Sequence, residues 1–170
     1  LEFHNLYIDG NNDTDLDAGA TTTYGFKQTN KKYQNWYYNN TVQAVGIAFS
    51  NCHHVENNIA AFCNRAAYYF CVGVVKNLAF CIAGTSGAVG FCKFAYGNII
   101  VGSYYGIYNC DRAYNNTGYG NYYSVRLSNG DFAFDTTCFG SYRHLYSNSN
   151  TGTGGELSGS YTHGHAGIQF

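Results

Sequence analysis

Five oxygen-bearing side chains stand at every second position near the start of the sequence. Such an array could bind a metal ion, because carboxylate and amide oxygens are the ligands that a hard cation such as Ca²⁺ prefers. The segment is not an EF-hand, since Thr14 stands where that loop needs glycine and Ala20 where it needs the bidentate glutamate. The alternative is a solvated loop. The candidate calcium ligands are Asp9, Asn11, Asp13, Asp15 and Asp17.

The other charged side chains do not form a pattern typical of catalysis. Asp131 and Asp135 are four residues apart in a strand-like segment, which places them at about 13 Å, too far for a paired-carboxylate site. Lys93 and Asp111 each follow a cysteine directly. Because these two residues would occupy equivalent positions on adjacent repeats, we expect a surface ion pair between them rather than a catalytic base and its partner. The sequence therefore predicts no catalytic residue.

A seven-residue spacing recurs six times and identifies the elements that would position these side chains. A Cys or Thr is followed six positions later by Asn or His, and successive motifs start 23, 19, 21, 18 and 28 residues apart. An imperfect period near 20 is typical of a solenoid, in which each repeat buries its apolar face against its neighbours. The motifs are Thr29/Asn35/Trp36, Cys52/Asn58/Ile59, Cys71/Asn77/Leu78, Cys92/Asn98/Ile99, Cys110/Asn116/Thr117 and Cys138/His144/Leu145.

The local pattern within each repeat indicates β-strands. Apolar residues alternate with period two, as in Leu6 and Ile8 or Ile99 and Val101, and no segment shows a sustained helical period. Glycine and asparagine separate these short runs, as expected of turns. Leucine-rich repeats would need Leu at several fixed positions in each unit, and this chain has few. The sequence therefore predicts an all-β coil.

Stacked parallel coils place equivalent residues in columns with a spacing of about 4.8 Å. Two columns are expected here. One contains Asn35, Asn58, Asn77, Asn98 and Asn116, followed by His144, and the other contains Cys52, Cys71, Cys92, Cys110 and Cys138.

The cysteine column is interpreted as a set of small buried side chains. Seven cysteines are an odd number, and their regular period argues against a conventional disulfide framework. Side chains that point the same way on adjacent coils have poor disulfide geometry, although one or more disulfides remain an alternative. A metal site needs ligands that converge on a point rather than follow a line.

The segments NLYIDG (5–10), GIAFSNC (46–52) and GIYNC (106–110) resemble right-handed parallel β-helix proteins of the pectin-lyase-like superfamily. The resemblance covers nearly the whole chain. It implies one domain, residues 1–170, with about six to seven coils of roughly 20 residues. It also implies that the asparagine column is a ladder of hydrogen-bonded amides at an inward turn.

The same resemblance leaves the function open, because the superfamily contains polysaccharide lyases, hydrolases, phage tailspikes, adhesins and non-catalytic surface proteins. An enzyme of this kind would be a polysaccharide lyase or a glycoside hydrolase. The paired Asp and Arg-Ile-Lys type motifs of the hydrolases are absent from this sequence.

Composition narrows the class of protein further. The formal net charge is −1, only 11% of the residues are charged, and no basic stripe is present, so nucleic acid is not an expected partner. No apolar run approaches 18 residues, which predicts no membrane insertion. A charge-poor chain rich in Tyr, Asn, Gly and Thr is typical of extracellular, cell-surface or virion β proteins. The lack of Met and a start inside a coil indicate a processed chain or a segment of a longer protein.

Two functions follow as hypotheses. The first is a structural β-helix subunit of an extracellular fibre, surface protein or virus tail, which associates with itself into a filament or trimer through coil ends or sides. The second is a polysaccharide-binding or polysaccharide-degrading domain, in which exposed aromatic rings stack on sugars. The candidate rings are Trp36, Tyr37, Tyr38, Tyr104 and Tyr105. No organic cofactor is expected, and calcium is the one ion that the sequence suggests.

Overall fold

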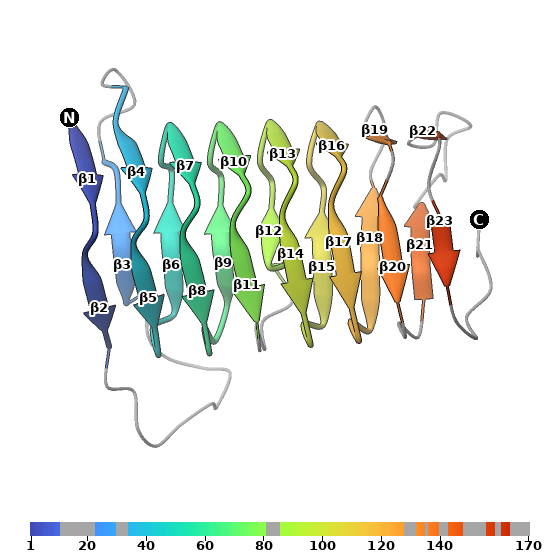
Figure 1. Ribbon diagram of the computed structural model, residues 1–170, viewed down its shortest axis with the longest axis horizontal. Helices are drawn as coiled ribbons and strands as arrows, with labels where there is room; N and C mark the ends of the chain where they lie inside the picture. Colours follow the sequence, from blue (N-terminus) through green and yellow to red (C-terminus); the bar gives the residue numbers. More distant parts are fainter. Residues whose placement is uncertain are drawn as a thin grey trace.

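The computed structural model describes residues 1–10, 23–29, 34–80, 86–127, 132–134, 136–139, 143–147, 156–158 and 161–163. These residues form an all-β solenoid without a helix, in which three parallel sheets run along one axis (Figure 1). Each turn of the chain adds one strand to sheet A, one to sheet B and one to sheet C. The predicted fold class, an all-β parallel β-helix, is confirmed.

Within the described residues, sheets A, B and C contain eight, eight and seven strands. Sheet A consists of β1 (Glu2–His4), β4 (Trp36–Tyr38), β7 (His54–Glu56), β10 (Gly73–Val75), β13 (Phe94–Tyr96), β16 (Arg112–Tyr114), β19 (Phe132–Phe134) and β22 (Glu156–Ser158). Sheet B consists of β2 (Tyr7–Asp9), β5 (Thr41–Gln43), β8 (Ile59–Ala61), β11 (Leu78–Phe80), β14 (Ile99–Val101), β17 (Thr117–Tyr119), β20 (Thr137–Phe139) and β23 (Tyr161–His163). Sheet C consists of β3 (Tyr24–Lys27), β6 (Ile47–Ser50), β9 (Ala66–Tyr69), β12 (Val89–Gly90), β15 (Tyr105–Tyr108), β18 (Tyr123–Leu127) and β21 (Arg143–Ser147).

The register of sheet A gives the length of each turn. Five successive turns take 18, 19, 21, 18 and 20 residues, measured along the aligned positions Trp36, His54, Gly73, Phe94, Arg112 and Phe132. The predicted period near 20 is therefore correct. Because neighbouring strands lie about 4.8 Å apart, each turn lengthens the solenoid without changing its cross-section, and side chains form long columns.

Most strands are three residues long, and the middle residue faces inward. In β7, for example, Val55 is buried between the half-buried His54 and Glu56. Alternation of this kind follows from the pleat of a strand. The buried columns are Tyr37, Val55, Val74, Ala95 and Ala113 in sheet A, Val42, Ala60, Ala79 and Ile100 in sheet B, and Phe49, Tyr68, Val89, Ile107 and Val125 in sheet C.

Aromatic rings fill the core in the first coils. Phe49 lies between Phe26 and Tyr68, with ring centroids 5.1 and 5.3 Å away and nearly parallel planes. The hydroxyl of the fully buried Tyr68 lies 3.1 Å from the carbonyl oxygen of Asn58 and 3.0 Å from that of Leu78. A buried phenol needs such partners, so this tyrosine joins the core to two adjacent turns.

A residue with positive φ turns the chain at most of the corners that the structure describes between two sheets. L-amino acids rarely adopt this conformation, and Asn and Gly adopt it most readily, which explains why the sequence is rich in both. The corner residues are Asn5, Asn39, Asn57, Lys76, Gly97 and Asn115 between sheets A and B, Ala44, Phe62, Gly102 and Gly120 between B and C, and Asn51, Phe70, Phe91 and Asn109 between C and A. At most of these corners the next residue is buried, and the asparagine and cysteine columns consist of such residues.

Candidate functional site

The corner between sheets A and B carries a ladder of buried asparagines. From the second member on, each Oδ1 accepts hydrogen bonds from the backbone N–H and the side-chain Nδ2 of the preceding member, at 2.8 to 3.2 Å, and the Oδ1 of the first member accepts from the Leu6 N–H at 3.0 Å. The side-chain amide also donates to a backbone carbonyl of the preceding turn, as Asn77 Nδ2 does to the Val55 oxygen at 2.9 Å. An amide can serve both neighbours because it has donors and an acceptor. The members are Asn40, Asn58, Asn77, Asn98 and Asn116.

Four of these five asparagines are the residues that the sequence predicted, but the prediction for the first member was wrong. Asn35 lies outside the ladder, because Trp36 pairs with His54 and thus aligns Asn35 with His53. Its Nδ2 donates to the Tyr37 hydroxyl at 3.5 Å. Asn40 takes its place, and the pair Asn39-Asn40 repeats as Asn57-Asn58 and Asn115-Asn116. That doublet was the sequence signal for the correct register.

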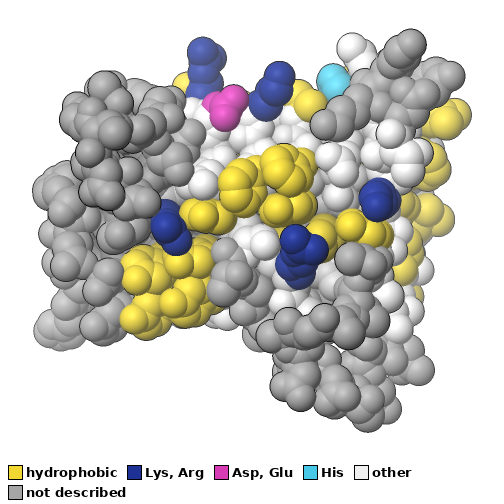
Figure 2. Space-filling model, turned by 180° about the vertical axis from the view of Figure 1, so that it is seen from behind, with side chains coloured by type: hydrophobic (Ala, Val, Ile, Leu, Met, Phe, Trp, Pro, Cys, Tyr) yellow, Lys and Arg dark blue, Asp and Glu magenta, His cyan; other side chains and the backbone are white. Residues whose placement is uncertain are grey.

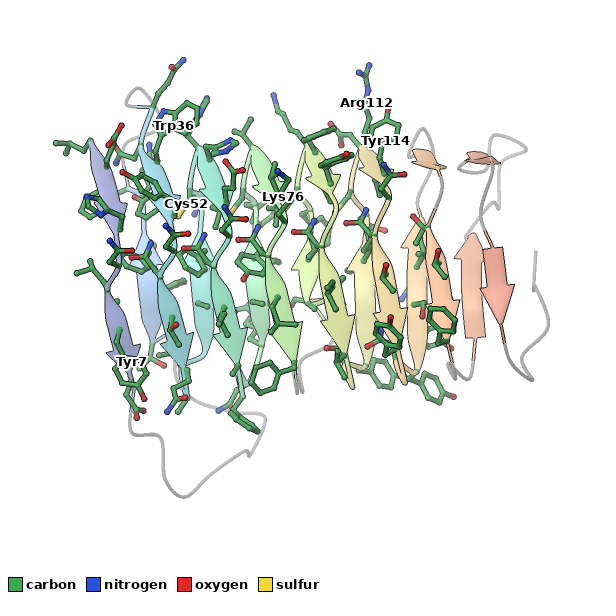
Figure 3. The ribbon with its side chains drawn as sticks, viewed as in Figure 1. Tyr7, Trp36, Cys52, Lys76, Arg112 and Tyr114 are labelled. Atoms are coloured by element: carbon green, nitrogen blue, oxygen red, sulfur yellow. The ribbon has the colours of Figure 1, made fainter. Side chains whose placement is uncertain are left out.

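The cysteine column is placed by the structure in the corner between sheets C and A. Cys52, Cys71, Cys92 and Cys110 are all buried there, and each Sγ donates to the carbonyl oxygen two residues earlier, at 3.3 to 3.7 Å. Figure 3 shows Cys52 inside the solenoid. The fifth predicted member, Cys138, instead pairs with Gly118 in sheet B. The coils near both ends of the repetitive region differ in length, which shifts the register there. For this reason the spacing alone misassigned Asn35 and Cys138.

The six cysteines among the described residues are free thiols, in agreement with the interpretation as buried small side chains. Burial raises the pKa of Cys63 to about 12 and that of Cys138 to about 11, from an ordinary value of 9.0. Burial likewise raises the pKa of Cys52 and Cys92. These thiols therefore stay protonated in the folded protein at neutral pH, which makes them poor nucleophiles.

The raised pKa values of these four buried thiols predict that the protein loses stability at alkaline pH. Since the folded-state pKa values lie above the unfolded ones, their contribution is complete below about pH 9 and disappears as the pH rises toward about 12. We expect the melting temperature to be lower at about pH 10.5 than at about pH 8. In the native protein at about pH 8, a thiol reagent should leave Cys52, Cys63, Cys92 and Cys138 unmodified until denaturant is added. Rapid modification of several thiols without unfolding would contradict this result.

The predicted calcium segment lies almost entirely outside the described residues. Only Asp9 can be placed, and its Oδ2 accepts hydrogen bonds from Gln43 Nε2 at 3.0 Å and from the Tyr7 hydroxyl at 3.2 Å. The positions of Asn11, Asp13, Asp15 and Asp17 are not described, so calcium binding stays a prediction.

The five aromatic residues proposed for sugar stacking do not form one surface. Tyr37 is 3% exposed, because it is the middle residue of β4 and faces the core, so its assignment to an outer surface was wrong. Trp36 projects outward from sheet A (Figure 3), with its ring 4.3 Å from that of His54. Tyr38 stacks on His4 at 4.9 Å. These two aromatic residues belong to β4, whereas Tyr105 begins β15 in sheet C and Tyr104 directly precedes that strand.

The tyrosines at the start of β15 and β18, and those directly before these strands, form their own cluster. Tyr104 stacks on Tyr122 at 4.9 Å and Tyr105 stacks on Tyr123 at 5.0 Å. Arg126 lies over the ring of Tyr105 and donates to its hydroxyl at 2.8 Å. Figure 2 shows hydrophobic side chains gathered across this side of the molecule, with Lys and Arg beside them. The sequence predicted two members of this cluster, and polysaccharide binding stays a prediction.

Charged side chains are sparse in the part of the chain that the structure describes. His54 Nε2 and Glu56 Oε2 lie 3.1 Å apart, within hydrogen-bond distance. The expected pair of Lys93 and Asp111 does not form, although Asp111 N–H bonds to the Cys92 carbonyl and so places the two residues on adjacent turns. No group of three or more His, Cys, Asp or Glu within the described ranges could hold a metal ion.

A groove of about 370 Å³ follows the corner between sheets C and A. One wall is the corner column with Gln28, Asn51, Phe70 and Phe91, and the other is the column one position beyond the cysteines, with His53 and Lys93. Sequence reasoning missed this groove because its residues come from four different turns. The available signal was the appearance of Phe directly before Cys71 and Cys92, where the flanking repeats have Asn.

The fold and these columns define the protein as a parallel β-solenoid with an internal asparagine ladder. Comparisons with protein-family models, with curated proteins and with solved structures find no match. The resemblance to the pectin-lyase-like superfamily therefore stays a prediction. The described residues include no helix that is long and apolar enough to cross a membrane.

Proposed function

We propose that this chain is a non-enzymatic structural β-solenoid, a subunit of an extracellular, cell-surface or virion assembly that associates side by side with its own copies through sheet B. The observation that carries this proposal is the outer face of sheet B, described next. A structural role also fits the internal ladders, which give a slender coil many backbone and side-chain hydrogen bonds along its axis.

From β5 to β17, the outward positions of sheet B carry no charged side chain. They form two columns: Thr41, Ile59, Leu78, Ile99 and Thr117, and Gln43, Ala61, Phe80, Val101 and Tyr119, of which Ala61 is buried. Ile59 is 38% exposed, Ile99 45% and Val101 36%. Exposed apolar side chains gathered on one face of a folded protein are typical of an interaction site.

A second copy of the same chain is the partner that matches this face best. The face offers no charge, so it has no feature that would select a charged partner. Its side chains repeat at the strand spacing of about 4.8 Å, and another parallel β-solenoid has the same repeat. Columns of Ile and Leu from two copies could therefore interdigitate over several turns, as stacked sheets do at about 10 Å separation.

The test is the molar mass in solution of the wild type and of the variants Leu78→Lys and Ile99→Lys. We expect the wild type to exceed the monomer mass of 18.7 kDa in a concentration-dependent way. Either variant should remain at that mass with an unchanged melting temperature, because a charge in the contact must lose its water. Sedimentation or light scattering measures the mass.

Val72→Lys is the matched control, since Val72 is also exposed, at 39%, but lies at the corner between sheets C and A. It should associate like the wild type. A wild type that stays monomeric at all concentrations, or an Ile99→Lys variant that associates normally, would refute side-by-side assembly through sheet B.

A further inference from the structure

We propose that the groove at the corner between sheets C and A binds a small organic anion with a flat apolar body, such as an aromatic carboxylate. This binding activity goes beyond the structural role and does not depend on it. The groove volume of about 370 Å³ lies within the range of small-ligand sites, which are mostly apolar with a few polar groups.

The two phenylalanines of the groove occupy positions where folding does not favour them. Phe70 and Phe91 both have φ of 54°, and the same corner has Asn51 at 56° in the preceding turn and Asn109 at 50° in the following one. A bulky residue is strained in this region, whereas Asn tolerates it. Phe70 is also 49% exposed, so its ring gains little from burial. Phe70 is exposed and Phe91 is half-buried, so both rings are accessible to a ligand from outside the coil.

The same two rings are held in a fixed arrangement. Their centroids are 5.2 Å apart, with an angle of 31° between the planes. Tyr69 packs edge-on against Phe70 at 4.4 Å, and Tyr108 packs edge-on against Phe91 at 5.0 Å. A ligand that stacks on these rings would not have to order them, which favours binding.

Polar groups beside the rings favour a negative charge on the ligand. Lys93 is exposed, forms no ion pair with any described residue and lines the groove next to Phe91. His53 Nδ1 has no hydrogen-bond partner in the described part of the chain, and Asn51 provides an amide at the same end. No lining residue is acidic. A flat ring on Phe70 and Phe91 would thus place a carboxylate within reach of the Lys93 ammonium.

The test is a titration of the protein with three probes, followed by NMR: benzoate, benzyl alcohol and acetate. Benzoate has both the ring and the charge, whereas each of the others has only one. We expect benzoate to bind with a dissociation constant on the order of 1 mM and to shift the resonances of Phe70, Phe91 and Lys93. The two control probes should bind at least about fivefold more weakly. Equal binding of benzoate and benzyl alcohol, or no shift at these residues, would overturn the proposal.

Replacement of Phe70 and Phe91 by Asn, the residue at the same corner of the flanking turns, distinguishes a role of the two rings in binding from a role in folding. The double variant Phe70→Asn/Phe91→Asn should keep or raise the melting temperature, because Asn suits positive φ, and should lose benzoate binding. Phe62→Asn is the matched control: Phe62 has φ of 51° and 51% exposure, but lies at the corner between sheets B and C. It should bind benzoate normally.

Lys93→Gln tests the charge and should weaken benzoate about fivefold while leaving benzyl alcohol unchanged. A lower melting temperature of the double variant together with unchanged benzoate binding would assign the two phenylalanines a purely structural role and overturn the proposal.

Discussion

Replacement of Asn77 by Ala is expected to lower the free energy of unfolding by about 3 kcal/mol. Asn77 is 2% exposed and lies in the middle of the ladder. Its Oδ1 accepts from the backbone N–H and the Nδ2 of Asn58, at 2.8 and 3.1 Å, and its Nδ2 donates to the Val55 carbonyl and to Asn98 Oδ1. The alanine variant leaves the Asn58 N–H buried without its acceptor.

The loss should exceed that of an ordinary hydrogen bond, because a buried donor that loses its partner keeps the full penalty of leaving water. Chemical denaturation measures the effect, with an unchanged dependence on denaturant concentration expected if the folded state is otherwise intact. The ladder is also continuous, so the variant interrupts the chain of amides on both sides of the gap.

Asn35→Ala is the control for this experiment. Asn35 is also buried, at 9% exposure, but it has one long hydrogen bond of 3.5 Å to Tyr37, and its Oδ1 has no partner in the described part of the protein. We expect its removal to change stability by less than about 1 kcal/mol. Equal losses for Asn35→Ala and Asn77→Ala would show that the ladder has no special contribution.

Replacement of Phe49 by Ala is expected to lower the free energy of unfolding by about 4 kcal/mol, a larger loss than that expected for Asn77→Ala. Phe49 is 0% exposed and lies between the rings of Phe26 and Tyr68. Tyr37 packs against its edge, with centroids 6.2 Å apart. The alanine variant leaves a cavity among three aromatic side chains, which cannot close because each is fixed to its own strand.

Thermal and chemical denaturation measure this loss, and Phe49→Leu should recover about half of it by filling part of the cavity. Phe62→Ala is the comparison, since Phe62 is 51% exposed at a corner and should cost less than about 1 kcal/mol. Similar losses for the buried and the exposed phenylalanine would contradict the assignment of Phe49 to the core.

The sequence by itself determined the class of fold and most of the ladder. Between Cys52 and Asn116 each repeat has nearly the same length, so the six-residue interval from Cys to Asn keeps both residues in register from turn to turn. Alternation with period two is a local property of a pleated strand, and it correctly predicted which segments are strands. These features follow from short stretches of chain and need no knowledge of distant contacts.

Only the tertiary structure decided the register near the ends of the repeat and the surfaces that follow from it. Asn40 rather than Asn35 enters the ladder because the pairing of β4 with β7 buries Tyr37 against Val55, and that long-range pairing fixes every side chain of the strand. Cys138 lies in sheet B for the same reason. A shift in register exchanges the inward and outward faces of a strand. The groove with Phe70, Phe91 and Lys93 likewise exists only after separate turns stack, because its lining residues come from four different turns.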